Sequence, residues 1–213
     1  MKNRIFVAFP VAMSGNINVR LVNFLLQANS KYEIQVGCVL GHQIAHNRNV
    51  LVKSFLETDC EWIFFIDTDT IPPNNVFDMT KHKLDICSGY YYQWTQNGLT
   101  PLLFQRNKTK EKRDYNVAVG RPTKIKNVVE VDATGAGCLL INRRVFENIE
   151  KPYFLTPYSD EGLALSTEDI YFFRKVIKAG YKVHVDMKMV ARHIKTVDLL
   201  EVAEWNYKIN HKN

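Results

Sequence analysis

Two aspartates, Asp67 and Asp69, flank a single threonine at the end of the apolar segment WIFFID (62–67), and Pro72 and Pro73 follow them. Residues two apart in an extended chain point to the same side, so both carboxylates are expected together if the extension persists. Like charges this close cost free energy unless a cation neutralises them, and Mg²⁺ or Mn²⁺ prefers such oxygen ligands. The pair therefore predicts a divalent metal site. The alternative is that both residues only begin a turn before the prolines.

The first third of the chain alternates between two hydrophobic patterns. Near-continuous apolar runs at 5–11, 34–40 and 62–67 indicate buried parallel strands. Between the first two runs, apolar side chains recur at helical spacing at Val19, Val22, Leu25 and Leu26, and between the second and third they do so at Ile44, Val50, Leu51, Phe55 and Leu56. This alternation predicts a doubly wound α/β fold with a mostly parallel sheet flanked by helices. Ligands bind such sheets at the carboxyl ends of the strands.

The remaining chain continues this pattern with one interruption. We expect a short helix at 74–81, then strands from Leu84, at 128–133 and at 138–142, the last followed by a helix near 143–149. A helix capped by Ser166 or Thr167 ends at Gly180 and leads into the strand segments KVHVD and MVARH. A C-terminal helix is expected at about 198–211. Residues 93–127 lack this alternation and suggest an excursion or β-ribbon.

The excess positive charge is concentrated in that excursion. The chain of 213 residues has a formal net charge of +6, and eight basic residues against two acids between Arg106 and Lys126 account for all of it. We therefore expect one domain, 1–213, with a basic excursion at about 105–127. This stretch is either a solvated loop or a site for an anionic partner such as phosphate or nucleic acid.

Cysteine spacing and hydropathy indicate in which cellular compartment the protein is expected. The four cysteines show no paired spacing and lie mostly in apolar runs, which favours buried reduced thiols. No apolar run approaches the ~18 residues of a membrane span, and the apolar opening segment is better explained as a core strand than as a signal peptide. A cytoplasmic protein without a transmembrane segment is expected.

Four segments in order resemble one family. FIDTDTIPP resembles the D-x-D signature of nucleotide-sugar glycosyltransferases of the GT-A fold, in the manner of family 2. Upstream, HNRNVLVKSFLETDCEWIFFID resembles the helix that precedes this signature, and downstream ATGAGCLLINRRVF resembles the glycine-containing loop and strand on the acceptor side. STEDIYFFRKVIKAGYKVHVD, with the later His193, resembles the Glu-Asp helix and its histidine. The resemblance covers about residues 4–195.

The resemblance implies a role for particular residues. Asp67, Asp69 and His193 would bind Mn²⁺ or Mg²⁺, and Asp169, or failing that Glu168, would be the catalytic base. The nucleotide-sugar donor, a UDP-sugar being favoured, would lie against Pro10, Val11, Arg48, Asn49, Asp67, Thr68, Gly135, Ala136 and Gly137. Several of these residues have a structural alternative. His193 could be a hydrogen-bonded structural histidine, and Arg48 a salt-bridged arginine. Glu168 and Asp169 could only favour the helix N-terminus, and 135–137 could be a simple turn.

The expected function is a metal-dependent glycosyltransferase that moves a sugar to an acceptor hydroxyl, with inversion. The acceptor would be a glycan or, given the basic stretch, modified DNA. Two alternatives stay open. A nucleotidyltransferase can share an α/β core and paired metal-binding acids, but no glycine-rich, lysine-containing loop follows the first strand. A nucleic-acid-binding module would use the 106–126 stretch alone.

Overall fold

The computed structural model describes residues 4–11, 15–95, 98–106, 115–117 and 127–210. Its centre is a seven-stranded sheet with the strand order β10-β13-β5-β12-β3-β1-β2. The pairings show that β10 and β12 run in the direction opposite to the other five, so the sheet is mostly parallel, as predicted. The strands are β1 (Arg4–Val11), β2 (Glu33–Leu40), β3 (Trp62–Ile66), β5 (Ile86–Tyr90), β10 (Val128–Val131), β12 (Cys138–Asn142) and β13 (Val183–Val190).

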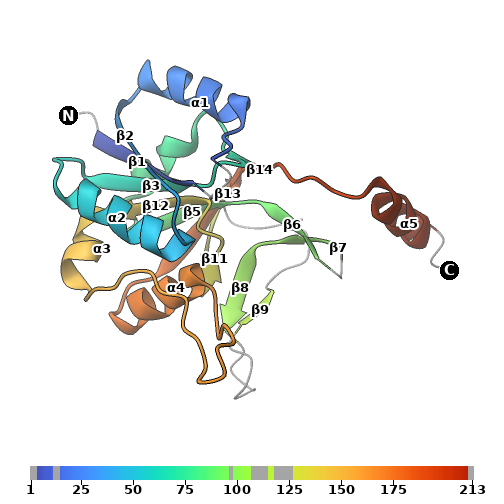
Figure 1. Cartoon of the computed structure of the whole chain (residues 1–213). Coiled ribbons are helices and arrows are strands. Elements are labelled where there is room, and N and C mark those ends of the chain that lie inside the picture. The colour runs from blue at the N-terminus through green and yellow to red at the C-terminus, as the bar shows by residue number, and fades with distance from the viewer. Residues whose placement is uncertain (1–3, 12–14, 96–97, 107–114, 118–126, 211–213) are drawn as a thin grey trace.

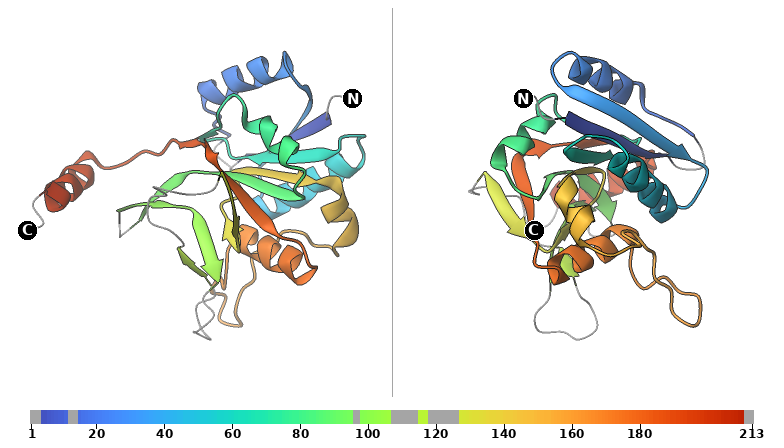
Figure 2. Two further views of the ribbon diagram at one scale, coloured as in Figure 1. Left: turned by 180° about the vertical axis from the view of Figure 1, so that it is seen from behind. Right: turned by 90° about the vertical axis from the view of Figure 1, so that its left-hand side faces the viewer.

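Helices cover both faces of this sheet (Figures 1 and 2). One face packs against α1 (Val19–Asn29) and the 3₁₀ helix η1 (Val76–His82), and the other against α2 (Ile44–Leu56), α3 (Arg143–Asn148) and α4 (Glu168–Lys178). Strand β3 lies between the layers, and all five of its side chains are buried. Within β3, the adjacent residues Phe64 and Phe65 point to opposite faces of the sheet. Phe64 packs in the core on the α1 side and Phe65 in the core on the α2 side. Burying each contributes about 1.5–3 kcal/mol.

The smaller elements lie beside the sheet. They are the hairpin β6 (Tyr92–Thr95) with β7 (Gly98–Pro101), the three-stranded sheet β11 (Ala133–Thr134), β8 (Leu103–Arg106) and β9 (Tyr115–Val117), and the pair β14 (Arg192–His193) with β4 (Thr70–Ile71). The β-ribbon expected beyond the core is therefore present in the described part of 93–127. Most of the basic stretch 106–126 lies outside the described residues.

The C-terminal helix α5 (Leu199–Asn210) forms where the sequence predicts it and projects away from the body (Figures 1 and 2). Trp205 contacts Trp94 of the β6–β7 hairpin, with ring centroids 5.0 Å apart. Within the described residues, no helix combines the length and apolarity of a membrane span. All four cysteines are free, and Cys38 is the exposed one among them.

The packing face of α1 differs from the face that the spacing indicated. Leu21, Phe24 and Ala28 are its buried residues, whereas Val19 and Leu26 are 77% and 70% exposed. Phe24 contacts Phe77 of η1, which fixes the rotation of the helix. Apolar residues occur on two sides of α1, so spacing alone did not identify the side that meets the sheet.

Candidate active site

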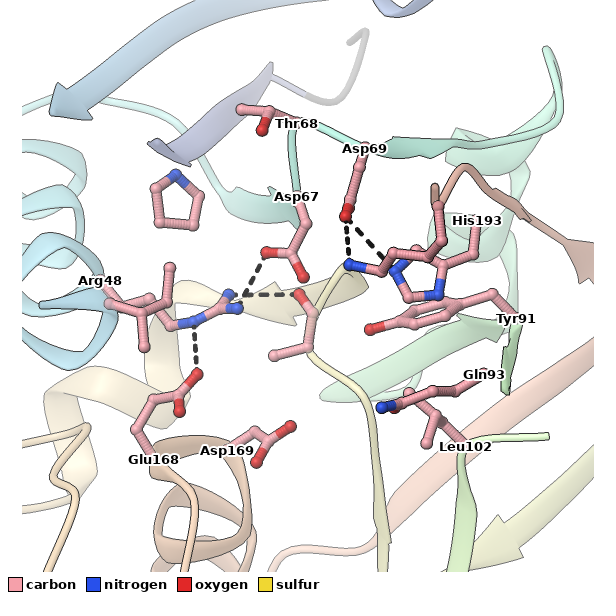
Figure 3. A pocket seen from close by; sticks show the side chains of 14 residues that line it. Arg48, Asp67, Thr68, Asp69, Tyr91, Gln93, Leu102, Glu168, Asp169 and His193 are labelled. Carbon is pink, nitrogen blue, oxygen red and sulfur yellow. Dashed lines mark hydrogen bonds and ion pairs between the residues drawn. The ribbon is translucent and has the colours of Figure 1, made fainter. Parts of the chain in front are cut away.

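A cavity of about 310 Å³ opens at the carboxyl edge of the central sheet (Figure 3). The last residues of β1, the chain segments after β3, β5 and β13, and the N-terminal halves of α2 and α4 all reach it. It is lined by Pro10, Ile44, Arg48, Asp67, Thr68, Asp69, Tyr91, Gln93, Leu102, Ala136, Glu168, Asp169, His193 and Lys195. Most of the predicted site residues are therefore brought together in one place, as expected for an open α/β sheet.

The acidic segment after β3 is a turn, not an extension of the strand. Asp67, Thr68 and Asp69 lie between the end of β3 and the start of β4, and the Thr70 amide donates to the Asp67 carbonyl oxygen at 3.0 Å. The expectation of an extended D-x-D is thus wrong in its local geometry. Both carboxylates still point into the cavity, with their partners on opposite sides (Figure 3).

Asp67 pairs with a buried arginine. Arg48 Nη2 donates to Asp67 Oδ1 at 2.9 Å, and Arg48 Nε donates to Glu168 Oε1 at 3.2 Å. Its Nη1 donates to the Ala136 carbonyl oxygen at 3.3 Å. Burial opposes the charge on Arg48, but Asp67 and Glu168 hold its pKa above the ordinary value. This arginine therefore joins three segments of the cavity wall, and its contact with a nucleotide stays a prediction.

Replacing Arg48 by methionine is expected to destabilise the fold by about 3–5 kcal/mol, because two carboxylates would lose a buried cation. The side chain is only 3% exposed, so water cannot take its place. Urea unfolding followed by circular dichroism measures this loss. The matched control is Arg144→Met, which removes an exposed, solvent-screened ion pair with Asp85 and should lower the unfolding midpoint far less. Equal unfolding midpoints for the two variants would contradict the assignment.

Asp69 pairs with two groups on the other side of the cavity. Lys195 Nζ lies 2.5 Å from Asp69 Oδ2, and His193 Nε2 lies 3.5 Å from the same oxygen. Burial raises the pKa of Asp69, but the neighbouring His193 and Lys195 outweigh it and lower the pKa to about 2. The repulsion that predicted a dication is therefore relieved within the protein, because each aspartate has its own cationic partner.

The ring of His193 is oriented for binding at Nε2. Strand β14 pairs with β4, which places His193 opposite Thr70 and beside Asp69. The ring Nδ1 lies 3.0 Å from the Tyr92 carbonyl oxygen, an acceptor that fixes the proton on Nδ1. Metal-binding histidines are held in this way, with the other nitrogen free to coordinate. The histidine predicted from the sequence is thus in a suitable place.

A metal ion fits this site with two protein ligands rather than three. Within the described residues, no group of three or more His, Cys, Asp or Glu side chains is arranged to hold a metal ion. The predicted triad of Asp67, Asp69 and His193 is not assembled, because Asp67 is drawn to Arg48. Asp69 Oδ2 and His193 Nε2 remain an adjacent oxygen and nitrogen donor. Such a pair suits an ion that completes its shell with water and substrate phosphates.

Asp169 lies on the opposite wall, at the first turn of α4 (Figure 3). Its Oδ1 accepts hydrogen bonds from the Thr167 hydroxyl and from the Ile170 amide, the latter at 2.8 Å. In the described part of the chain these contacts leave Oδ2 available as a proton acceptor. Glu168 is committed to Arg48 instead, and burial raises its pKa while Arg48 opposes the shift. Of the two acids, Asp169 is therefore the one with an oxygen available to accept a proton, and its role as catalytic base stays a prediction.

The glycines after β11 serve close packing inside the wall. A Cβ on Gly137 would lie 2.6 Å from Asp67 Oδ2, and a Cβ on Gly135 would lie 2.3 Å from the Tyr91 hydroxyl oxygen. That hydroxyl accepts a hydrogen bond from the Gly137 amide at 3.1 Å. A side chain at Gly137 would displace the Asp67 carboxylate, and one at Gly135 would displace the Tyr91 ring. Ala136 is the residue of this loop that lines the cavity.

Four predicted donor-binding residues are not part of the cavity lining: Val11, Asn49, Gly135 and Gly137. The Val11 carbonyl oxygen accepts from the Asn47 side-chain amide at 3.0 Å. Asn49 hydrogen bonds with the backbone of Ala45, Tyr153 and Phe154. Their donor-binding roles stay predictions without support from the cavity.

Lys195 is the charged cavity residue that sequence reasoning missed. It follows His193 by two residues, and that spacing at a strand end was the available signal. Ile44, Gln93 and Leu102 were also missed, and nothing in their types or spacing indicates a site. Tyr91, the residue that follows β5, also lines the cavity, and its ring centroid lies 4.9 Å from that of His193.

Comparison with known proteins identifies the fold through structure alone. No family model and no curated protein sequence matches the chain. Among solved structures, A197 from STIV has a TM-score of 0.59 and 20% identity, and the alignment covers 92% of this chain and 87% of A197. GalNAc-T7, solved with UDP, GalNAc and Mn²⁺, has a TM-score of 0.61 and 12% identity over 92% of this chain and 44% of its own. The fold is GT-A-like.

These identities are too low to carry more than the fold. The chain also spans less than half the length of GalNAc-T7. The inositol-1-phosphate CTP transferase from T. maritima aligns over 99% of this chain with 10% identity. At a TM-score of 0.47 this likeness carries no argument for nucleotidyl transfer.

Proposed function

We propose that the protein is a glycosyltransferase that moves a sugar from a nucleoside diphosphate donor, with a UDP-sugar favoured, to an acceptor hydroxyl with inversion. One observation carries the proposal. A single cavity at the carboxyl edge of the sheet has Asp69 and His193 on one wall and Asp169 on the other. Groups suited to a diphosphate with its cation thus face a group suited to proton removal.

The charges around the cavity favour a cationic ligand. Four carboxylates, those of Asp67, Asp69, Glu168 and Asp169, line it together with the two permanent cations Arg48 and Lys195. Asp69 and His193 would hold Mn²⁺ or Mg²⁺ between the protein and the donor diphosphate. Such an ion neutralises charge on a departing diphosphate, a contribution of several kcal/mol. GalNAc-T7 was solved with UDP and Mn²⁺, which is consistent with this ligand class on this fold.

Asp169 would perform the proton transfer. Its free Oδ2 accepts the acceptor's hydroxyl proton while the hydroxyl oxygen forms a bond to the anomeric carbon. The bond from that carbon to the diphosphate oxygen breaks, and the nucleoside diphosphate leaves on the opposite face, which inverts the anomeric configuration. Arg48 keeps Asp67 and Glu168 in the wall behind the reacting groups. The cavity supplies proximity as well as the base.

The acceptor is proposed only by class, as a hydroxyl of a glycan or of modified DNA. Acceptors are recognised by variable loops, and the basic stretch 106–126, a candidate for an anionic acceptor, lies largely outside the described residues. A variant with its eight lysines and arginines neutralised should lose DNA affinity and its steep salt dependence. If DNA affinity is unchanged, the DNA branch of the proposal fails.

The test of the proposed function is calorimetry of the purified chain with UDP, GDP and other nucleoside diphosphates, with and without Mn²⁺. We expect UDP to bind tightly only when Mn²⁺ is present. A panel of nucleotide sugars then identifies the donor by the diphosphate released during slow hydrolysis. Pyrophosphate as the product would support a nucleotidyltransferase instead. The absence of metal-dependent binding of any nucleotide would refute the proposal.

A further inference from the structure

The Asp69 oxygen that faces His193 is already held by an ammonium group. Lys195 Nζ lies 2.5 Å from Asp69 Oδ2, and His193 Nε2 lies 3.5 Å from that same oxygen. Figure 3 draws both contacts as dashed lines. A divalent ion between Asp69 and His193 would need this oxygen too. The Lys195 ammonium and the divalent ion therefore compete for one carboxylate, because two cations that both contact Asp69 Oδ2 repel each other.

The backbone fixes the base of Lys195 but leaves its end free to move. The β14–β4 pairing sets His193 opposite Thr70, and the Ile194 amide donates to the Asp69 carbonyl oxygen at 2.8 Å. Residues two apart on an extended segment share a side, so Lys195 lies on the same side as His193. Its side chain is 49% exposed, and its four-carbon stem allows the ammonium to turn without backbone movement.

The cavity offers that ammonium a second position. Lys195 and Asp69 both line it, on the side where we place the donor diphosphate. Arg48, the other permanent cation of the lining, is committed to Asp67, Glu168 and the Ala136 carbonyl oxygen. Lys195 is thus the cation best able to follow an anionic ligand, because its partner Asp69 is the residue that a metal ion would take over.

We propose that Lys195 is an exchangeable counter-ion: it holds Asp69 when no divalent ion is bound, and it turns to the donor diphosphate when such an ion replaces it. The second half rests on the proposed function, whereas the first half concerns only side chains of this chain. Lys195 thus acts on metal binding indirectly, by occupying Asp69, and it binds the donor directly. Removing it should have opposite effects on the affinities for these two ligands.

The test uses Lys195→Met in the full chain, because methionine keeps much of the apolar stem and removes the charge. Titration calorimetry with MnCl₂ alone should show Mn²⁺ affinity raised about tenfold, since a charged hydrogen bond no longer competes. At saturating Mn²⁺, UDP affinity should fall about tenfold. The matched control is Lys182→Met, which removes an ion pair with Glu130 at 2.8 Å outside the cavity lining, and should change neither affinity.

Two more variants keep the result interpretable. Lys195→Gln should reproduce the rise in Mn²⁺ affinity if the methionine variant folds poorly by circular dichroism. In an Asp69→Asn background, Lys195→Met should no longer raise Mn²⁺ affinity, because the contested carboxylate is absent. Unchanged or weaker Mn²⁺ binding in both Lys195 variants, or no Mn²⁺ binding to any variant, would overturn the inference.

Failure of the proposed function looks different. If Mn²⁺ affinity rises in the Lys195 variants while no nucleotide binds to any form, the exchange at Asp69 stands and the glycosyltransferase proposal fails. If UDP binds the unchanged protein with Mn²⁺ but the Lys195 variants keep the original Mn²⁺ affinity, the proposed function stands and the exchange is refuted.

Discussion

Replacing Asp69 by asparagine is expected to abolish metal-dependent UDP binding and to reduce kcat/KM for sugar transfer by about 10²–10³-fold. The carboxamide keeps the shape of the side chain but removes the charge that Lys195 and His193 now contact. His193 and Lys195 lower the pKa of Asp69 to about 2, so this carboxylate is ionised at neutral pH in the unchanged protein, whereas asparagine has no charge to regain at any pH. Calorimetry with UDP and Mn²⁺ and a transfer assay measure both effects.

Asp78→Asn provides a matched control for this variant. Asp78 has the same 34% side-chain exposure as Asp69 and also pairs with a lysine, Lys81, at 2.7 Å, but it lies on η1 outside the cavity lining. Its substitution should leave UDP binding and turnover unchanged. An Asp69→Asn variant that transfers sugar as fast as the unchanged protein, with or without Mn²⁺, would exclude Asp69 as the metal ligand.

Replacing Asp169 by asparagine is expected to lower kcat by about 10²–10⁴-fold and to leave the affinity for UDP with Mn²⁺ within about twofold. Asparagine can still accept the Thr167 and Ile170 hydrogen bonds through its side-chain oxygen, so α4 should begin at the same residue. It cannot take a proton from an acceptor hydroxyl. Steady-state kinetics together with calorimetry separate turnover from donor binding.

Two further variants show whether this effect is specific to Asp169. Asp160→Asn changes an exposed acid in the loop that leads to α4 and should have no effect on kcat. Glu168→Gln should mainly lower stability, because it weakens the buried contact with Arg48. Full turnover by Asp169→Asn, or a fall in kcat that only Glu168→Gln produces, would reassign the base.

Much of the fold follows from local patterns in the sequence. The apolar runs at 5–11, 34–40 and 62–67 match β1, β2 and β3 within about one residue. Burial in a sheet covered on both faces accounts for β1 and β3, whose side chains are almost all buried. The expectation that 34–40 is a buried strand is wrong, because β2 lies at the edge of the sheet and its residues are exposed or half-buried. The helix α4 begins after Thr167 and is followed by Gly180 at φ +90°, as its caps predicted. The face of α1 was misassigned because its burial depends on η1 and the sheet, which are distant in sequence.

The residue types of the candidate site could be predicted from the sequence, but the ion pairs that those residues form could not. The D-x-D spacing indicated two carboxylates acting together, yet the turn after Ile66 separates their partners. The i, i+2 relation that does hold is the one between His193 and Lys195, because the β14–β4 pairing fixes the segment. The spacing of Lys195 two residues after His193 was the available signal, but it did not identify Asp69 as the partner until that strand pairing was known.

The sequence by itself determined which acids and bases are available and that the segments carrying most of them end at one edge of a parallel sheet. Strand direction and the order of strands and helices suffice for this, because parallel strands bring their carboxyl ends together. Only the tertiary structure decided the partners: Arg48 bridges Asp67 and Glu168, and Lys195 reaches Asp69 across 126 positions of the chain. Ion pairs depend on distances of a few ångströms between elements, and spacing along the chain does not encode those distances.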